Sequence, residues 1–431
     1  MKRITKILRR KVTPSIQEKL SFLLKSQYWP LEKLKEYQWS RVQELLTHSY
    51  ENVSYYRMLL KSHDLKPDDI KSFEDLKKIP ILTKRNIQEN TDKLISGLCD
   101  KKNLFLNSTG GSTGHPLVFY QDENYLEWEK ASAIRAWKYF EGFDKEELEA
   151  VFWGAERDIK KGLSIKGIIY NVLRNGMLPL NTFYYDSDLI IRYFLYYNFL
   201  KPKILRGYAS SLFYMANFIE ENNLKIHYPK AIISSAETLW PEMRKKIEKV
   251  FNSEIYDSYG SREVSQIATE CSMHDGLHVV MENQYVEIVD KCIIVTNLNN
   301  YGMPFIRYKI GDLADGIVEG ACGCGRHSMR LTRLRGRESD NISLPNGKVI
   351  HGEYFTHLFY GLFNVDSFLV EYRTKQNNLV IKCNKLTSED KMSLKTRINE
   401  DLSFSNINFE KLDESTKTST GKFKFIKVVH I

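Results

Sequence analysis

Hydrophobic and polar residues alternate with two different periods along this chain. Over residues 29–46, apolar side chains recur every three or four positions, which predicts an amphipathic helix. We expect most of residues 1–100 to be helical. Beyond residue 103, short apolar runs typical of strands are separated by longer amphipathic stretches. This alternation predicts an α/β fold, in which helices are layered around mixed β-sheets.

Individual elements are bounded by turn residues. Strands are predicted at 103–107, 116–120, 148–153, 230–234, 254–256 and 291–296. A helix is predicted at 241–251, because Pro241 fits a first helical turn. After Gly336 the pattern becomes strand, helix, two strands, helix and terminal strand, with a hairpin over 368–383. We therefore predict a large domain over 1–338 and a small α+β domain over 339–431.

Composition and charge narrow the class of protein. A chain of 431 residues is too long for one hydrophobic core of ordinary size, so we expect two or more domains. Its content of 42% hydrophobic residues is sufficient to form their cores. Neither a secretory signal nor a run of membrane-spanning length is present, so we expect a cytoplasmic enzyme. The net charge of +9 comes from 63 basic and 54 acidic residues that are mixed along most of the chain. No nucleic-acid-binding motif accompanies this charge, so we expect no nucleic-acid partner.

Basic residues cluster only near the start of the chain, over residues 2–11. A cluster of this kind can associate weakly with anionic lipid. A solvated chain terminus is the alternative. At most, the sequence predicts weak peripheral membrane association through this segment.

A glycine-rich loop is the strongest local signal. Glycine allows close backbone approach, and successive N–H groups can surround a phosphate. A plain turn between the two flanking strands is the alternative. A Walker-type phosphate loop is excluded, because His115 and Pro116 stand where that motif requires a lysine and a helix. The loop comprises Ser108, Thr109, Gly110, Gly111, Ser112, Thr113 and Gly114.

Further polar motifs follow in order, several of them directly after predicted strands. Ligands of α/β proteins lie at the carboxyl ends of strands, so these positions favour a binding site. The motifs are Ser235-Ala-Glu237, Asp257-Ser-Tyr-Gly-Ser-Arg-Glu263, Arg307-Tyr-Lys-Ile-Gly-Asp312, Arg333-Leu-Arg-Gly-Arg337 with Asp340, and Ser419-Thr-Gly-Lys422-Phe-Lys424.

At these residues the chain resembles the adenylate-forming superfamily of acyl-CoA ligases, luciferases and adenylation domains. Within it, the chain is most similar to the phenylacetate–CoA ligase branch, including CapK-like members associated with surface polysaccharide synthesis. The resemblance runs from about residue 80 to the C-terminus. It implies that a carboxylate attacks the α-phosphate of ATP to give acyl-AMP and pyrophosphate, and that an acceptor then displaces AMP. It also implies that the larger domain is the adenylation domain and the smaller one a mobile lid.

The resemblance also implies roles for individual residues. Lys422 matches the mobile catalytic lysine, and Glu263 matches the acid that binds Mg²⁺, which neutralises phosphate charge. The glycine-rich loop would hold the β- and γ-phosphates, and Asp312 would accept hydrogen bonds from the ribose hydroxyls. Asp340 would be the hinge of the mobile domain. Taken singly, Lys422 could be a surface lysine, Asp312 a turn cap and Glu263 a solvated acid.

Other matched residues would surround the nucleotide and the acid. Tyr259 and the backbone of 235–237 would flank the adenine. An acyl pocket is expected at Trp153, Gly154 and Tyr208, for which core packing is an equal alternative. The remaining nucleotide-binding residues implied are Ser235, Ala236, Glu237, Asp257, Gly260, Ser261, Arg262, Arg333 and Arg337.

The acceptor is left open. Coenzyme A is expected, as in the phenylacetate–CoA ligases. An amino group on a sugar or amino acid, in capsule or O-antigen biosynthesis, is the alternative. A non-catalytic nucleotide-binding protein is a further reading, although it would predict loss of Lys422, Glu263 or Asp312, and all three are present. The sequence specifies neither the carboxylic acid nor the oligomeric state.

Two residues depart from the family pattern. Arg262 stands where the family motif commonly has threonine, directly before the glutamate. His115 replaces the lysine that usually follows the last glycine of the loop. Because backbone N–H groups would hold most of the phosphate, we expect activity to survive the change at residue 115.

Six cysteines in a cytoplasmic chain argue against a disulfide framework. Cys322 and Cys324 are separated by one residue, and Cys271 lies near two histidines. Cys271, His278, Cys322 and Cys324 would complete a closed tetrahedral zinc site of structural type. His274 is a rival ligand, and simple buried thiols are the alternative to zinc.

Overall fold

The computed structural model describes most of the chain. The described ranges are 13–109, 117–137, 147–153, 165–181, 187–338, 342–345, 349–350, 354–355, 358–359, 365, 368–402, 404–412 and 425–429. The chain forms two compact units. The first unit comprises Met1–Arg10, Glu146–Ile255 and Arg335–Ile431, and the second comprises Lys11–Lys145 and Tyr256–Leu334. The domain boundary expected after residue 338 stays a prediction.

A parallel sheet organises residues 146–255 of the first unit. Its order is β6-β5-β3-β4, and its strands are β3 (Glu149–Trp153), β4 (Met177–Asn181), β5 (Ile204–Tyr208) and β6 (Ala231–Ser235). The connecting helices are α10 (Ile165–Tyr170, followed by a π-turn over Asn171–Asn175), α11 (Ser187–Leu200), α12 (Ala209–Glu221) and α13 (Pro241–Phe251). Helix α13 begins at Pro241 and buries Met243, Ile247 and Phe251. The α/β fold class is therefore confirmed.

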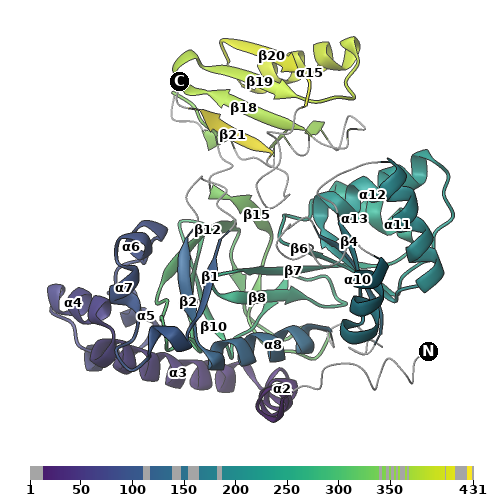
Figure 1. The fold of residues 1–431 in the computed structure, drawn as a ribbon. Coiled ribbons are helices and arrows are strands. Elements are labelled where there is room, and N and C mark those ends of the chain that lie inside the picture. The colour runs from purple at the N-terminus through teal and green to yellow at the C-terminus, as the bar shows by residue number, and fades with distance from the viewer. Residues whose placement is uncertain are drawn as a thin grey trace. The chain divides into compact units, whose positions relative to one another are not determined.

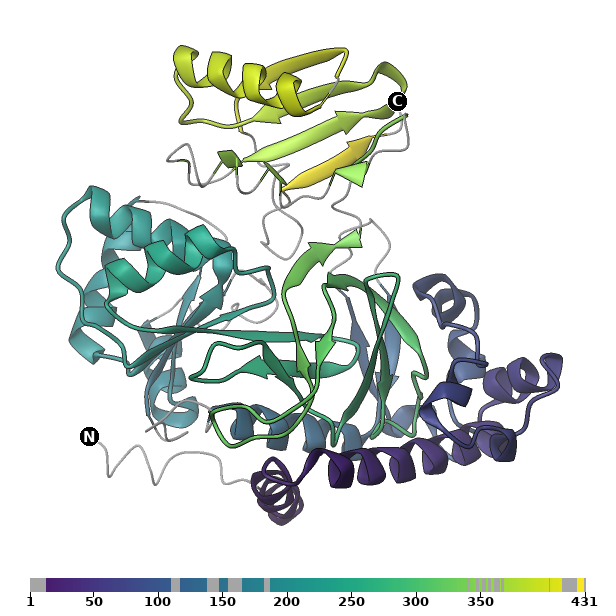
Figure 2. The ribbon, with the colours of Figure 1, turned by 180° about the vertical axis from the view of Figure 1, so that it is seen from behind.

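The C-terminal part of the chain has its own sheet and core. The strand order is β20-β19-β18-β21, with one helix, α15, between β19 and β20. Helix α15 lies along this sheet (Figures 1 and 2). Leu394 and Ile398 of α15 are buried in the same cluster as Tyr372 and Ile381 of the sheet. The elements are β16 (Ile342–Ser343), β17 (Val349–Ile350), β18 (Leu369–Arg373), a 3₁₀ turn (Thr374–Gln376), β19 (Asn378–Lys382), α15 (Ser388–Asp401), β20 (Asn406–Glu410) and β21 (Ile426–Val429). The predicted hairpin is confirmed as β18–β19, whereas β20 was not expected.

The second unit begins with helices. They are α2 (Pro14–Ser26), α3 (Leu31–Asn52), α4 (Ser54–Ser62), α5 (Phe73–Leu76), α6 (Lys84–Glu89), α7 (Thr91–Leu94) and, later, α8 (Glu123–Trp137). Short 3₁₀ turns occupy Pro67–Asp69 and Lys101–Asn103. Within the first hundred residues, these helices lie between Pro14 and Leu94 and form the helical leader. None of the described helices is both long and apolar enough to cross a membrane.

The strands of the second unit form antiparallel pairs. Strand β1 (Phe105–Ser108) pairs with β2 (Val118–Gln121), and β10 (Gln284–Val289) pairs with β11 (Cys292–Asn297), which pairs with β12 (Tyr308–Ala314). A further set runs in the order β13-β14-β9-β8-β7. Its members are β7 (Ile255–Ser261), β8 (Ser265–Glu270), β9 (Leu277–Val279), β13 (Ile317–Val318) and β14 (Arg330–Leu331). Strand β15 (Leu334–Arg337) lies where the chain passes back into the first unit.

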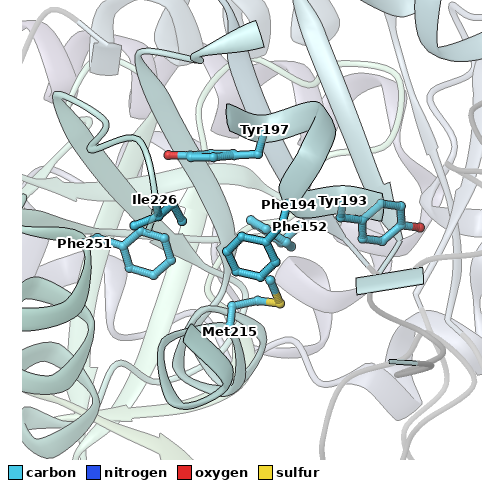
Figure 3. Close-up of a pocket in the computed structure, with 7 residues that line it drawn as sticks. All are labelled: Phe152, Tyr193, Phe194, Tyr197, Met215, Ile226 and Phe251. Carbon is cyan, nitrogen blue, oxygen red and sulfur yellow. The ribbon is translucent and has the colours of Figure 1, made fainter. Parts of the chain in front are cut away.

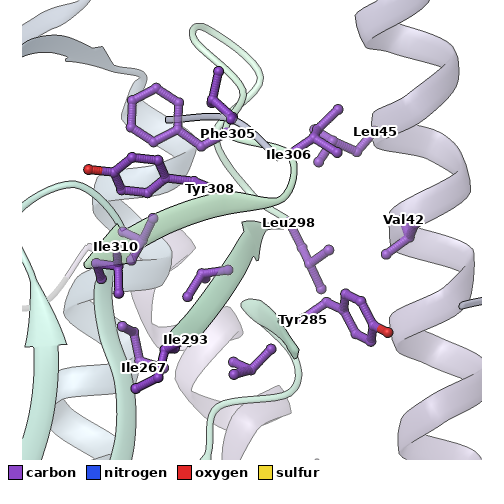
Figure 4. Packing of buried hydrophobic residues seen from close by; sticks show 14 of the residues in the cluster. Val42, Leu45, Ile267, Tyr285, Ile293, Leu298, Phe305, Ile306, Tyr308 and Ile310 are labelled. Atoms are coloured by element: carbon purple, nitrogen blue, oxygen red, sulfur yellow. The ribbon is translucent and has the colours of Figure 1, made fainter. Parts of the chain in front are cut away.

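Helix α3 packs against the strands of this unit. Val42 and Leu45 of α3 face the apolar cluster that contains Tyr285, Leu298 and Ile306 (Figure 4). Gln38, one turn earlier, is buried, and its amide group donates to the carbonyl oxygens of Met281 and Gln284. The leader is therefore part of the core that supports the strands.

One buried ion pair fixes α8 against the strands. The guanidinium of Arg135 lies 2.7 Å from Oε1 of Glu282, and both side chains are 2% exposed. Ser26, at the end of α2, also donates to Glu282. Two helices and the segment before β10 therefore meet at one carboxylate.

We predict that Glu282→Gln destabilises the protein strongly, because it leaves the buried charge of Arg135 unpaired. The expected loss is about 3–5 kcal/mol of unfolding free energy. Chemical denaturation measures it. The exposed pair Lys77–Glu74 provides the control, and Glu74→Gln should cost less than about 1 kcal/mol. Equal losses in the two variants would contradict the assignment.

Candidate functional site

The glycine-rich segment begins and ends in a β-hairpin. Ser108 pairs with Val118 in the β1–β2 ladder. Beyond that pair, Thr109 N–H donates to the carbonyl of Leu117 at 2.9 Å, and Leu117 N–H donates to Oγ1 of Thr109 at 2.9 Å. Residues 110–114 and His115 lie outside the described residues. The two predicted flanking strands are confirmed, with the loop closed at its base by these bonds.

A second hairpin, β7–β8, carries the next motif. Glu263 lies in its turn, and Ser261 pairs with Ser265, which has a positive φ of 64°. Gly260 is required by close packing, because a Cβ at this position would lie 2.4 Å from the carbonyl oxygen of Ser265. The glycine of this motif therefore has a structural reason to be there.

A hydrogen bond joins the two hairpins. Nε2 of Gln121, on β2, donates to the backbone carbonyl of Arg262 at 3.0 Å. Gln121 is buried. This bond therefore holds the base of the glycine-rich loop against the turn that carries Glu263. We call this hydrogen-bonded structure the frame.

Strand β12 holds the two acidic residues of the predicted site. The hydroxyl of Tyr259 donates to Oδ2 of Asp312 at 2.9 Å. The hydroxyl of Tyr308 donates to Oε1 of Glu263 at 3.1 Å, and both of these residues are buried. Gly311 has a φ of 88°, so the strand bends directly before Asp312. Strand β12 is thus hydrogen-bonded to Glu263 through Tyr308 and to Tyr259 through Asp312.

Arg307 anchors the start of this strand. Its guanidinium makes two bonds to Glu287, each 3.1 Å long, and also donates to the backbone carbonyls of Lys77 and Ile79. Burial raises the pKa of Glu287, while its hydrogen bonds and charge attraction to Arg307 oppose that rise. Leu82 N–H donates to the carbonyl of Arg307, and Lys309 N–H to that of Leu82. Arg307 therefore has a structural role, which is to fix the start of β12.

The sequence did not single out Tyr308 or Gln121. Tyr308 stands inside the Arg307–Asp312 motif, but its bond to Glu263 joins residues 45 positions apart. Gln121 is the last residue of strand β2 and belongs to none of the motifs identified in the sequence. Burial alternates along β2, where Val118 is exposed and Phe119 and Gln121 are buried. This alternation could have indicated that the polar side chain of Gln121 is buried and therefore needs a hydrogen-bond partner.

A second group of predicted residues lies in the first unit. Ala236 has a positive φ of 68°, and Oε2 of Glu237 accepts from the backbone N–H of Ser210 at the start of α12. The rings of Trp153 and Tyr208 contact each other, with centroids 4.4 Å apart. Their role as an acyl pocket stays a prediction.

The remaining predicted residues are placed as follows. Ser235 ends β6, and Asp257 in β7 donates its N–H to Glu270. The carbonyl of Arg333 accepts from Asp315 N–H, and Arg337 ends β15 on the surface. Gly154, Asp340 and Lys422 lie outside the described residues.

The predicted cysteine and histidine residues form one cluster in the second unit. One ligand atom from each of Cys271, His278, Cys322 and Cys324 lies within 4.8 Å of the others. The Sγ atoms of Cys271 and Cys322 are 3.7 Å apart, and Sγ of Cys324 is 3.4 Å from Nε2 of His278. Zn–S bonds of about 2.3 Å in a tetrahedron separate two sulfurs by roughly 3.8 Å. The donor set therefore fits a metal ion.

His278, rather than His274, belongs to this cluster. Its Nδ1 lies 2.9 Å from Oγ of Ser328, which directs Nε2 toward the thiols. Burial, followed by the charges of Arg326, Arg330 and Arg135, lowers the pKa of His278 to about 3. His274 instead contacts Glu270 at 3.2 Å and stacks on Tyr256.

Backbone pairing and a tight turn position the ligands. His278 on β9 pairs with Arg330 on β14, so two distant segments meet. The turn at Cys322 is closed by its N–H bond to the carbonyl of Arg326, and Gly325 adopts a φ of 80°. Arg326 also donates to Gln27, at the end of α2. The cluster thus connects the β-strands with the helical leader.

We predict that Gly260→Ala destabilises the β7–β8 hairpin, because the added Cβ collides with backbone. The expected cost is about 1–3 kcal/mol of unfolding free energy. Gly316→Ala is the matched control, since its nearest contact would be 3.9 Å away. Thermal unfolding compares the two. A Gly260→Ala protein as stable as the control would contradict this role.

Comparison with known proteins gives a consistent picture. No family model matches the chain. It is 27% identical over 416 residues to Protein CapK of Staphylococcus aureus, covering 91% of this chain and 88% of that protein. It is 26% identical over 337 residues to a phenylacetate-coenzyme A ligase of Pseudomonas putida, covering 72% of each.

Among solved structures, the fold matches 2-hydroxyisobutyryl-CoA ligase in its postadenylation state. The TM-score is 0.73 at 17% identity, and the match covers 94% of this chain and 91% of that one. That structure contains an acyl-AMP ligand. The match extends across both units of the fold described above.

Proposed function

We propose that this chain, which belongs to the adenylate-forming superfamily in the branch of CapK and the phenylacetate–CoA ligases, activates a carboxylic acid with ATP. The product is an acyl-AMP, whose acyl group passes to coenzyme A. One observation carries the proposal. The hairpin of the glycine-rich loop, Glu263, Tyr259 and Asp312 are linked in a single hydrogen-bonded frame.

The frame matches what adenylation requires. A carboxylate must approach the α-phosphate of ATP although both carry negative charge, so the site has to supply oriented donors and positive charge. Glu263 would hold Mg²⁺, for which carboxylate oxygens are suitable ligands, and the ion would neutralise phosphate charge. Tyr308 binds Oε1 of Glu263, and no hydrogen bond among the described residues engages Oε2. That oxygen is available for a ligand.

The other residues would orient the substrates. Asp312 would accept from the ribose hydroxyls, with its carboxylate held by Tyr259. The N–H groups of residues 108–114 would bind the β- and γ-phosphates. Lys422 would place an ammonium group between the α-phosphate and the attacking carboxylate, and so stabilise the charge that develops there.

We predict that Lys422→Ala lowers carboxylate-dependent ATP–pyrophosphate exchange by about a hundredfold or more, because one charge-stabilising group is lost. Glu263→Gln should raise the magnesium concentration needed for half-maximal exchange. Exchange is measured over a panel of acids. Lys417→Ala, a change at a neighbouring lysine, is the control and should leave exchange unchanged.

Two outcomes would count against the proposal. If ATP binds but no acid supports exchange, the chain is a nucleotide-binding protein without catalysis. If exchange persists undiminished in Lys422→Ala, the lysine assignment is wrong. The chain is also similar to Protein CapK, so the amine acceptor expected for the CapK-like branch is the second candidate. Addition of coenzyme A or of sugar and amino-acid amines to the acyl-AMP complex distinguishes the two.

We further propose that the cluster of three thiols and one imidazole binds zinc. Four protein ligands complete a tetrahedron, so no position remains for a substrate, and the site is structural. Its place between β9, β14 and the end of α2 indicates that the ion stabilises the second unit.

We predict about one equivalent of zinc per chain, because four protein ligands form one closed site. Elemental analysis measures it, and chelation should lower the unfolding temperature. Cys322→Ser and His278→Ala should lose most of the metal. His274→Ala, which removes a histidine outside the cluster, should retain it. Full zinc content in His278→Ala, or none in the unmodified protein, would refute the site.

A further inference from the structure

Helix α11 has apolar side chains on two opposite faces. On its inner face, Tyr193, Phe194 and Tyr197 pack against Met215 and Phe251 of neighbouring helices (Figure 3). The cavity left between them is about 10 Å³, which is at the lower limit for one water molecule. The inner face is therefore filled by the protein itself.

The outer face of α11 is apolar and exposed. Ile191, Leu195 and Phe199 are 49%, 64% and 84% exposed, and their spacing of four residues puts them in one stripe. At about 200 Å² for each large apolar side chain, the stripe exposes roughly 400 Å². An exposed apolar stripe of this kind is often an interaction surface.

Basic residues lie beside this stripe, mainly near the C-terminal half of α11. Arg192 and Lys201 are exposed on and beside the helix, and the sequence contains no acidic residue between positions 189 and 219. Asn198 donates to the carbonyl of Lys225 at 3.0 Å and accepts from His227 N–H at 2.7 Å. These bonds bring the segment 225–228 against the C-terminal half of α11.

That segment adds to the same surface. Lys225 is exposed, and Tyr228 is 54% exposed. Aromatic residues with a polar end are favoured at the interface between lipid and water, and lysine is favoured near anionic headgroups. The combination of protruding apolar side chains, tyrosine and lysine is typical of a surface that binds a bilayer.

We propose that the outer face of α11, together with Lys225 and Tyr228, docks on the surface of an anionic lipid membrane. A second copy of the chain fits this face less well. A stable protein interface buries about 800 Å² per partner, twice the area of the stripe. A two-fold dimer through this face would also bring its positive charges together.

Vesicle flotation of the full chain tests the proposal. The vesicles contain phosphatidylglycerol mixed with phosphatidylcholine, or phosphatidylcholine alone. Binding should require the anionic lipid and fall with added salt. Leu195→Ser/Phe199→Ser should reduce binding at least about tenfold, because two inserting side chains are lost. Lys201→Gln/Lys225→Gln should weaken binding to anionic vesicles.

Matched controls distinguish binding through this face from non-specific hydrophobic adsorption to vesicles. Leu98 and Met392 are 73% and 68% exposed elsewhere in the chain, so Leu98→Ser/Met392→Ser should bind as the unmodified protein does. Neutralisation of the basic residues at 2–11 should leave binding largely intact. If that change alone abolishes binding, or if Leu195→Ser/Phe199→Ser still binds fully, the proposal is wrong.

Two further readouts complete the test. Light scattering shows whether the unmodified protein is a dimer that the Leu195→Ser/Phe199→Ser change dissociates, and that result would assign the face to a second copy. ATP–pyrophosphate exchange without lipid should be unchanged in all these variants. Loss of vesicle binding with retained exchange supports docking, whereas absence of exchange in every protein affects only the proposed function.

Discussion

The described part of the candidate site depends on the ion pair between Arg307 and Glu287. The guanidinium makes two bonds to the carboxylate and two more to backbone carbonyls of the segment before α6. This fixes the start of β12, and the next residues along that strand supply Tyr308 and Asp312. Tyr308 holds Glu263, and Asp312 is held by Tyr259. A buried ion pair therefore helps to orient the carboxylates of Glu263 and Asp312.

Elements with a strong local pattern were predictable from the sequence. Helix α13 begins at Pro241 as expected, because proline and a regular apolar spacing act over a few residues. The hairpin β18–β19 was predicted for the same reason. Strand β20 was missed because it buries only Ile407, so its pattern of apolar residues is weak. An edge strand is specified mainly by the neighbour on which it pairs.

The candidate site was predictable to the extent that it depends on residue type. Thiols and imidazoles mark a metal site by their chemistry, so the three cysteines could be named, together with His278 and its rival His274. The choice between His274 and His278 could not be made, because it depends on the pairing of β9 with β14. The bonds of Tyr308 and Gln121 were likewise not predictable, since each joins segments that are distant in the sequence.

The bond between Gln121 and residue 262 has a consequence for how this protein can vary. It is accepted by the main-chain carbonyl of Arg262, so it does not depend on which side chain stands there. The family motif commonly carries threonine at this position, and arginine occupies it here. Evolution can thus change the charge next to Glu263 while the turn keeps its place. The same hydrogen bond would let an engineer vary residue 262 without rebuilding the hairpin.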